Sequence, residues 1–284
     1  MAIALTCENH LHYGYITVRT NAIIPDPPEP DPEDPEVESN DPVDPPLYSE
    51  VTQVVIKRKI SDAFLFLSVY VKDISSQEDF DITFEDPYCR NNYDYLYKVD
   101  YINAEGGVVD SQTCTIKSIF DVLVIADSSQ IWYTPLNVSA INPTTIAPYA
   151  MNTPIYARKP SLYKFSSLNY EEGNCTGIFL DMVDLSGNET NIQFVTDHNW
   201  QYRKSFKNWL TLGNAKFIKS VSGEMWLVGI KSDSVTDNSL FSNAEIEGAR
   251  QIEFGWVEVG EADNEEDLYE NGLINVPMEF WSGQ

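Results

Sequence analysis

The sequence has no long hydrophobic run and no basic N-terminal segment. No apolar stretch approaches the roughly 20 residues that a helix needs to cross a bilayer. The first 18 residues contain neither Lys nor Arg, and no long apolar segment follows them. We therefore expect neither membrane insertion nor an N-terminal export signal.

Cysteine is scarce and widely spaced. Cys7, Cys89, Cys114 and Cys175 form no Cys-X-X-Cys pair, which argues against zinc ribbons and thioredoxin-like chemistry. In a chain of 284 residues, four such thiols are most simply reduced and mostly buried. The even number leaves disulfides open, and the spacing selects no pairing.

Basic residues are few: 18 Lys and Arg face 44 Asp and Glu, so the net charge is −26. Residues 25–46, PDPPEPDPEDPEVESNDPVDPP, hold nine of these carboxylates, and the remaining 262 residues still carry −17. The acidity is therefore global. It repels phosphate backbones and anionic lipids, and we expect no direct nucleic-acid binding.

The common motifs of catalysis are missing: GxGxxG, the P-loop, GxSxG and HExxH do not occur. Cys7, His10 and His12 are a candidate metal set, but no fourth ligand stands nearby. His198 lies beside Trp200 without a nearby Ser or Cys nucleophile pattern. We therefore predict no catalytic residue, no metal site and no cofactor.

Acidic residues near the C-terminus are a candidate calcium site. Their spacing does not match an EF-hand, and a solvated first helical turn is the simpler interpretation. Paired carboxylates for glycoside hydrolysis stay open, because any two of the 44 acids can meet in space. The residues concerned are Asp263, Glu265, Glu266, Asp267 and Glu270.

Aromatic residues are abundant, with 16 Tyr, 13 Phe and 6 Trp. They suit the half-buried surfaces of β-sheets. Trp132, Trp209, Trp226 and Trp256 lie within strand or helix patterns and are expected in the core. Trp200 and Trp281 are less constrained, and they are the candidates for stacking on a glycan.

The hydrophobic pattern is mainly that of strands. The clearest strand is 93–102, where Tyr93, Tyr95, Tyr97, Val99 and Tyr101 fall on one face. Further strands are predicted as follows: 13–24, 51–60, 63–73, 108–117, 120–127, 131–134, 176–183, 191–196, 214–221, 224–231 and 251–258. The fold class is mainly β.

Two helices interrupt this pattern. The spacing of Tyr202, Phe206, Trp209 and Leu210 predicts an amphipathic helix near 202–212. A second short helix is expected to begin near residue 263 or 264 and to stop at Gly272.

The chain divides into two predicted domains. Residues 142–160 are rich in Pro, Thr, Asn and Ala and lose the periodicity, which places a boundary near residue 150. An N-terminal β domain spans 1–150 and a C-terminal β domain spans 151–284. Residues 25–46 interrupt the first domain as an extended arm, because nine prolines and like charges favour polyproline II.

Two C-terminal segments carry a resemblance to a known group of proteins. They are FKNWLTLGNAKFIKSVSGEMWLVGIKSD from Phe206 and FGWVEVGEADNEEDLYENGLI at 254–274. They resemble minor tail proteins, in the distal tail or baseplate, of phages that infect Gram-positive bacteria. DSQTCTIKSIFDVLVIADSSQIWY and LYKFSSLNYEEGNCTGIFLD are similar more loosely, so the likeness covers roughly residues 93–281.

The resemblance implies β-sandwich or split-barrel-like domains that assemble into rings in the virion tail, made in the host bacterial cytoplasm. It implies partners among other copies and neighbouring tail proteins, and it brings no catalytic residues. The arm at 25–46 departs from the pattern and is expected to lie on a neighbouring subunit. Two alternatives stay open: a carbohydrate-binding adhesin module, and a cell-wall glycoside hydrolase.

Overall fold

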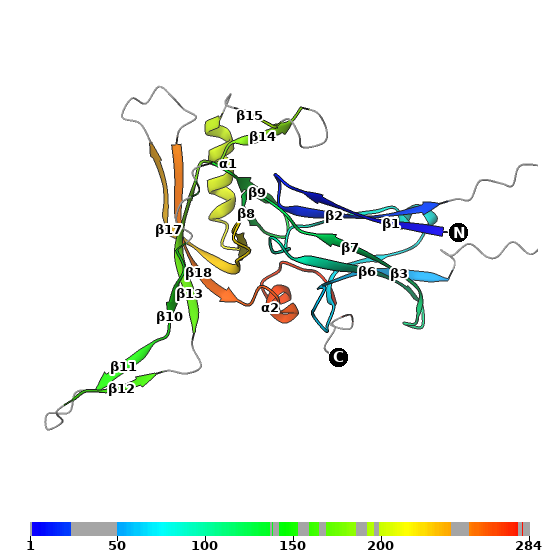
Figure 1. Cartoon of the computed structure of the whole chain (residues 1–284), viewed down its shortest axis with the longest axis horizontal. Helices are drawn as coiled ribbons and strands as arrows, with labels where there is room; N and C mark the ends of the chain where they lie inside the picture. The colour runs from blue at the N-terminus through cyan, green and yellow to red at the C-terminus, as the bar shows by residue number, and fades with distance from the viewer. Residues whose placement is uncertain are drawn as a thin grey trace, which may run out of the picture.

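The computed structural model describes residues 2–23, 50–136, 138, 142–152, 159–164, 169–185, 192–195, 199–239, 250–277 and 280. Within them the chain is mainly β, as predicted, and its strands pair antiparallel (Figure 1). The arm at 25–46 lies outside the described residues.

The N-terminal part contains a three-stranded and a four-stranded sheet. The three-stranded sheet has the order β1 (Ala2–His10), β2 (Tyr15–Ile23), β5 (Ile82–Asp86). The four-stranded sheet has the order β4 (Leu67–Asp73), β3 (Val51–Ile60), β6 (Asp94–Asn103), β7 (Val108–Lys117). A 3-10 helix, Gln77–Phe80, precedes β5.

One hydrophobic core joins these two sheets. Ile16 and Val18 of β2 belong to the same buried cluster as Val54 and Ile56 of β3. From β6 the cluster takes Tyr95, Tyr97, Val99 and Tyr101. The predicted alternation is therefore confirmed from Tyr95 to Tyr101, because a period of two turns every second side chain to the same face. It is wrong for Tyr93, which lies before β6 and is 41% exposed.

The third sheet has seven strands. Their order is β10 (Thr144–Ile146), β13 (Tyr170–Gly177), β18 (Arg250–Gly260), β17 (Met225–Ser239), β16 (Lys216–Lys219), β8 (Leu123–Ala126), β9 (Ile131–Thr134). Strands from both sides of residue 150 pair in this sheet. The division into two domains at 150 stays a prediction, although strand pairing crosses it.

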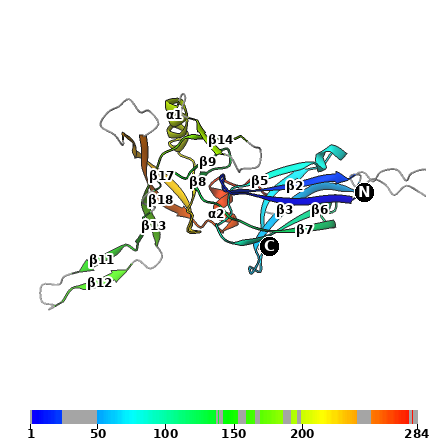
Figure 2. The same cartoon turned by 45° about the horizontal axis from the view of Figure 1, so that its top comes forward.

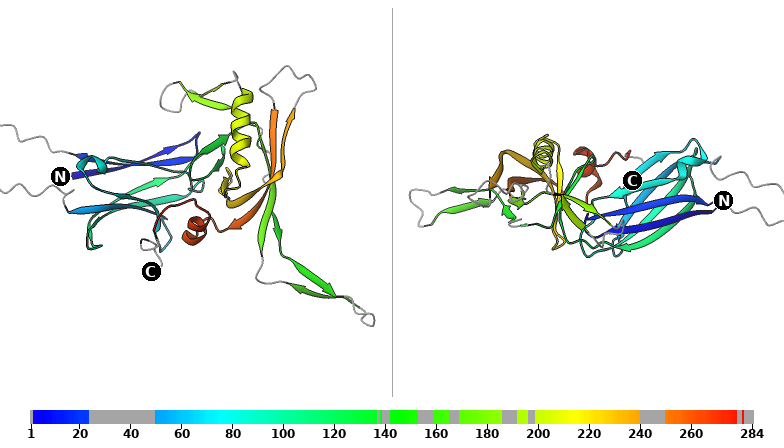
Figure 3. Two further views of the ribbon diagram at one scale, coloured as in Figure 1. Left: turned by 180° about the vertical axis from the view of Figure 1, so that it is seen from behind. Right: turned by 90° about the horizontal axis from the view of Figure 1, so that it is seen from above.

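Helix α1 (Asn199–Leu210) covers one face of the seven-stranded sheet (Figures 1 and 3). Phe206, Trp209 and Leu210 are buried against Ile218 of β16 and Trp226 of β17. The amphipathic helix is thus confirmed, although it begins before residue 202 and ends before residue 212, the expected limits. Thr211 ends it by donating its hydroxyl to the carbonyl oxygen of Lys207 at 2.9 Å.

The opposite face of the same sheet packs on the C-terminal segment and the N-terminal sheets. Phe217 and Leu227 share a buried cluster with Leu268 of α2 (Glu265–Glu270) and with Tyr88. Asn264 caps α2 by accepting hydrogen bonds from the backbone N–H groups of Glu266 and Asp267. The second predicted helix is therefore confirmed.

The predicted strand 176–183 is wrong. β13 ends at Gly177, and a new strand, β14 (Asp181–Asp184), pairs with β15 (Ile192–Val195). The backbone of Ile178 bonds outside the sheet ladder: its N–H donates to Leu136, and its carbonyl oxygen accepts from the hydroxyl of Thr134. These bonds turn the chain between the two strands.

A last hairpin, β11 (Tyr149–Asn152) with β12 (Ser161–Lys164), projects from the end of the molecule opposite the N-terminal sheets (Figures 1 and 2). It pairs with no other strand of the described chain.

Candidate functional site

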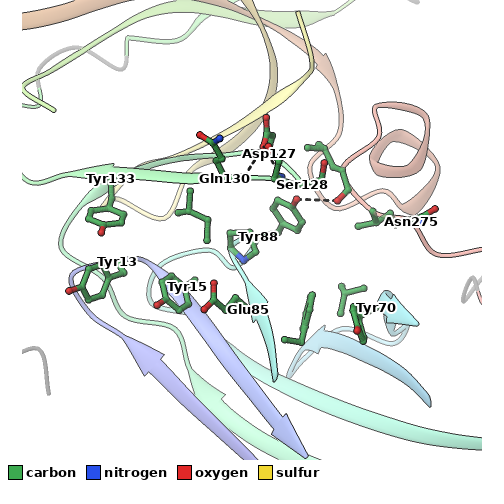
Figure 4. Close-up of a pocket in the computed structure, with 17 residues that line it drawn as sticks. Tyr13, Tyr15, Tyr70, Glu85, Tyr88, Asp127, Ser128, Gln130, Tyr133 and Asn275 are labelled. Carbon is green, nitrogen blue, oxygen red and sulfur yellow. Dashed lines mark hydrogen bonds between the residues drawn. The ribbon is translucent and has the colours of Figure 1, made fainter. Parts of the chain in front are cut away.

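The clearest concave site is a cleft of about 610 Å³ between the N-terminal sheets, the β8–β9 turn and the C-terminal segment (Figure 4). Its walls are built from parts of the chain that are far apart in the sequence. Its lining residues are Tyr13, Tyr15, Val69, Tyr70, Phe84, Glu85, Pro87, Tyr88, Asp127, Ser128, Ser129, Gln130, Ile131, Tyr133, Leu273, Ile274 and Asn275.

Aromatic rings dominate the walls of this cleft. Tyr13, at the turn between β1 and β2, meets Tyr133 of β9 edge to face, with ring centroids 5.0 Å apart. Tyr70 of β4 lies 5.1 Å from Phe84 of β5. These four rings are half-buried, so each is held by neighbours and still presents surface to the cleft.

The polar rim comes from the β8–β9 turn and from Glu85. Asp127 shapes the turn: one carboxylate oxygen accepts from the N–H groups of Ser129 and Gln130 and from the Ser129 hydroxyl. Its other oxygen accepts from Nζ of Lys216 at 2.8 Å. Burial acts to raise the pKa of Asp127, but the hydrogen bonds from Lys216 and Ser129 outweigh it and hold the pKa below its usual range.

The roles of the two acids in the cleft bear on the glycoside hydrolase alternative. A glycosidase needs two carboxyl groups that face one substrate. Glu85 and Asp127 are the acids in the cleft lining, and Asp127 is occupied in holding the turn and pairing with Lys216. The cleft is therefore suited to binding by stacking and hydrogen bonding.

A buried charged network lies between the N-terminal sheets and β16. Nη1 of Arg58 donates to both carboxylate oxygens of Asp86 at 2.5 and 2.6 Å. Tyr97 donates its hydroxyl to Asp86 at 2.9 Å and lies 3.0 Å from the Cys89 thiol. These side chains are buried, so each charge is compensated inside the protein.

Lys219 of β16 ties the seven-stranded sheet to the N-terminal part. Its buried ammonium donates to the carbonyl oxygens of Gly14 at 2.5 Å and Cys89 at 3.1 Å. It also lies 4.7 Å from the centroid of the Phe120 ring. Burial lowers the pKa of Lys219 from 10.5 to about 8.

The pKa of Lys219 predicts a pH-dependent stability. Above pH 8 the folded chain loses this proton while the unfolded chain keeps it up to about 10.5, so the contribution of Lys219 rises with pH. Between pH 8 and 9.5 we expect the unfolding free energy of the natural chain to gain roughly 1–2 kcal/mol relative to Lys219→Met. Urea titration of both chains at the two pH values tests this, and a constant difference contradicts it.

A second surface of interest is the β11–β12 hairpin. Tyr149 and Met151 are each 62% exposed, Leu162 is 55% exposed and Tyr163 is 59% exposed. Met151 lies directly opposite Leu162 in the pairing, so these two side chains share a face with Tyr149. The hairpin thus presents large apolar side chains to solvent on both faces.

The candidate metal residues do not converge on one point. Nε2 of His10 lies 2.8 Å from the hydroxyl of Thr17, and Nδ1 of His12 lies 3.0 Å from the carboxylate of Asp121. Cys7 has Cys114 as its neighbour, and this thiol acts with burial to raise the pKa of Cys7. Among the residues that the structure describes, no group of three or more His, Cys, Asp or Glu is placed to hold a metal ion.

Three of the five acidic C-terminal residues have structural partners for their carboxylates. Asp263 pairs with Arg90 at 2.6 Å, and Glu265 accepts from the backbone N–H of Ser68. Asp267 accepts from the backbone N–H of Glu261. These carboxylates anchor α2 and the turn before it.

Trp132, Trp209, Trp226 and Trp256 lie in the core, as expected. Trp200 is 48% exposed at the start of α1, away from the aromatic cleft. Trp281 and His198 lie outside the described residues. Sequence reasoning missed the tyrosines of the cleft, since only folding brings Tyr13, Tyr70 and Tyr133 together.

Comparison with protein-family models finds no match to this chain, and comparison with curated protein sequences finds none either. No helix within the described ranges combines the length and the apolar character that a bilayer crossing requires.

Proposed function

We propose that this chain is a non-enzymatic structural component of a phage tail, in the distal tail or baseplate, that assembles with other copies into a ring or hub. The observation that carries assembly is the exposed apolar hairpin β11–β12. Its place in a virion tail, made in the host bacterial cytoplasm, rests on the sequence resemblance.

The hairpin needs a partner for physical reasons. An isolated two-stranded ribbon is marginally stable in water, because it has no layer on which to bury its side chains. Here four large apolar side chains on β11 and β12 are each more than half exposed. These two strands form the projecting hairpin (Figure 2). A partner surface that covers them stabilises the ribbon and removes this apolar area from water.

Charge favours another copy of the chain as that partner. Residues 128–170, which include the hairpin, contain no Asp or Glu and three basic residues: Arg158, Lys159 and Lys164. The whole chain nevertheless carries −26. A basic, apolar hairpin can therefore approach the acidic body of a neighbouring copy, and such a head-to-tail contact closes into a ring when the rotation permits.

The N-terminal domain, the arm at 25–46 and the acidic surface each have a role in such an assembly. The shared core of the two N-terminal sheets is what a β-sandwich or split-barrel-like domain requires. The arm at 25–46 acts as an extended strap on a neighbouring subunit. The acidic surface neither binds nucleic acid nor inserts into membranes, and neighbouring tail proteins are the other partners.

Assembly is tested by changing the hairpin without breaking it. The double variant Met151→Lys, Leu162→Glu removes two apolar side chains and keeps opposite charges in the directly paired positions. We expect its self-association constant to fall at least tenfold, since each covered side chain contributes about 1.5–3 kcal/mol. Light scattering across a concentration series measures this.

Leu212→Lys is the matched control, because Leu212 is 64% exposed at the end of α1 and lies outside the hairpin. We expect this control to associate as the natural chain does. A natural chain that stays monomeric at high concentration and is absent from purified virions contradicts the proposal.

The aromatic cleft favours a second candidate, a carbohydrate-binding adhesin module. Half-buried tyrosines provide stacking surfaces, and Glu85 and Gln130 provide hydrogen-bonding groups. For this function we expect retention on a glycan array to fall at least tenfold in Tyr133→Ala and to persist in Trp200→Ala. Equal retention by both variants and the natural chain excludes the cleft as the glycan site.

A further inference from the structure

Two cysteines lie at neighbouring edges of the N-terminal sheets. Cys7 is in β1, the edge strand of the three-stranded sheet, and Cys114 is in β7, the edge strand of the four-stranded sheet. β1 and β7 are in contact but do not pair as strands. The two edge strands therefore meet without a strand ladder between them.

The thiol of Cys114 is a neighbour of the Cys7 thiol and acts with burial to raise the pKa of Cys7. Both cysteines are free and half-buried. The other two cysteines are different, because Cys89 and Cys175 are fully buried. Cys89 is also engaged with Tyr97 and Asp86.

We propose that Cys7 and Cys114 are an oxidisable pair, which forms a disulfide that links the edges of the two N-terminal sheets. The two cysteines are neighbours on edge strands that are already in contact, and a disulfide needs their sulfurs to approach to about 2.05 Å. The chain itself crosses between the two sheets three times, from β2 to β3, from β4 to β5 and from β5 to β6, and the disulfide adds a link at the β1–β7 edge. The inference does not depend on the proposed function.

The oxidant is a low-molecular-weight disulfide such as oxidised glutathione. The thiolate of one cysteine attacks it, forms a mixed disulfide and releases one glutathione thiolate. The second cysteine then loses its proton, attacks the protein sulfur of the mixed disulfide and releases the second glutathione. Two protein thiols are oxidised, one small disulfide is reduced, and the two protons pass to the released thiolates.

Two properties of the site set how this reaction behaves. Burial, and then the neighbouring Cys114 thiol, raise the pKa of Cys7, so formation of the disulfide is faster at higher pH. The bond closes a loop of roughly 100 residues, which restricts the unfolded chain. We expect Tm to rise by roughly 5–10 °C on oxidation.

The test is a peptide map of the natural chain after treatment with oxidised glutathione. Trypsin places each cysteine on its own peptide: Cys7 on 1–19, Cys89 on 73–90, Cys114 on 99–117 and Cys175 on 165–203. We expect a disulfide between peptides 1–19 and 99–117 within one chain, with Cys89 and Cys175 still alkylated. We also expect the rise in Tm to be lost in Cys7→Ser and in Cys114→Ser.

Alkylation of both Cys7 and Cys114 after this treatment overturns the proposal. Glutathione that persists on either thiol, or a link formed only between two copies, overturns it as well. The map of the natural chain decides the question even where a Ser variant does not fold.

Discussion

Replacing Asp86 by alanine is expected to lower the free energy of unfolding by about 3–5 kcal/mol. The carboxylate is fully buried and accepts hydrogen bonds from Nη1 of Arg58, the hydroxyl of Tyr97 and the backbone N–H of Tyr88. Its removal leaves the buried guanidinium of Arg58 without its counter-charge and leaves donors unpaired. Chemical denaturation followed by tryptophan fluorescence measures the loss.

Two comparisons distinguish the effect of leaving a buried charge unpaired from the effect of losing any ion pair. Asp263→Ala removes a pair of similar length, with Arg90 at 2.6 Å, but Asp263 is 55% exposed and we expect a loss below about 1 kcal/mol. Adding Arg58→Met to Asp86→Ala removes the stranded charge, so the double variant should be more stable than Asp86→Ala alone. Equal losses in Asp86→Ala and Asp263→Ala contradict this account of the network.

Gly14→Ala is expected to cost about 2–4 kcal/mol of unfolding free energy. Gly14 has φ of +70°, a left-handed conformation that residues with a Cβ adopt at a cost. A Cβ there would also overlap Cγ2 of Val124, on the first strand of the β8–β9 hairpin. The carbonyl group of Gly14 accepts from Lys219, so a shift in its backbone disturbs the tie between the two parts of the molecule.

Gly106→Ala is the matched control. Gly106 has φ of +81° in the turn between β6 and β7, and a Cβ there meets no atom within 4 Å. The Gly106→Ala chain should lose only the cost of a left-handed residue with a Cβ, about 1–2 kcal/mol. A Gly14→Ala loss no larger than that of Gly106→Ala would show that Val124 and the neighbouring side chains yield to the added methyl group.

Local patterns predicted the elements that are decided locally. The alternation in β6, the apolar face of α1 and the Asn264 cap of α2 each depend on residues within a few positions of one another. The turn between β13 and β14 was missed because residues near 134–136 hold it, some forty positions away.

The buried lysines of β16 are a second feature that local sequence patterns do not predict. In sequence, Lys216 and Lys219 flank Phe217 and Ile218 like the solvent-facing ends of a strand. Both are fully buried, because Asp127 compensates one and the carbonyl groups of Gly14 and Cys89 compensate the other. These partners are 89 to 205 positions away, so no local pattern reveals them.

The order of the seven-stranded sheet has a consequence for synthesis on the ribosome. The N-terminal sheets, β1 to β7, are complete once residue 117 has emerged, whereas β8 and β9 join the large sheet only through β16. At roughly 5–20 residues per second, the apolar strand Leu123–Ala126 then waits on the order of ten seconds for Lys216–Lys219. During that interval a nascent chain exposes LVIA, a segment that a chaperone can bind or that a neighbouring nascent chain can capture.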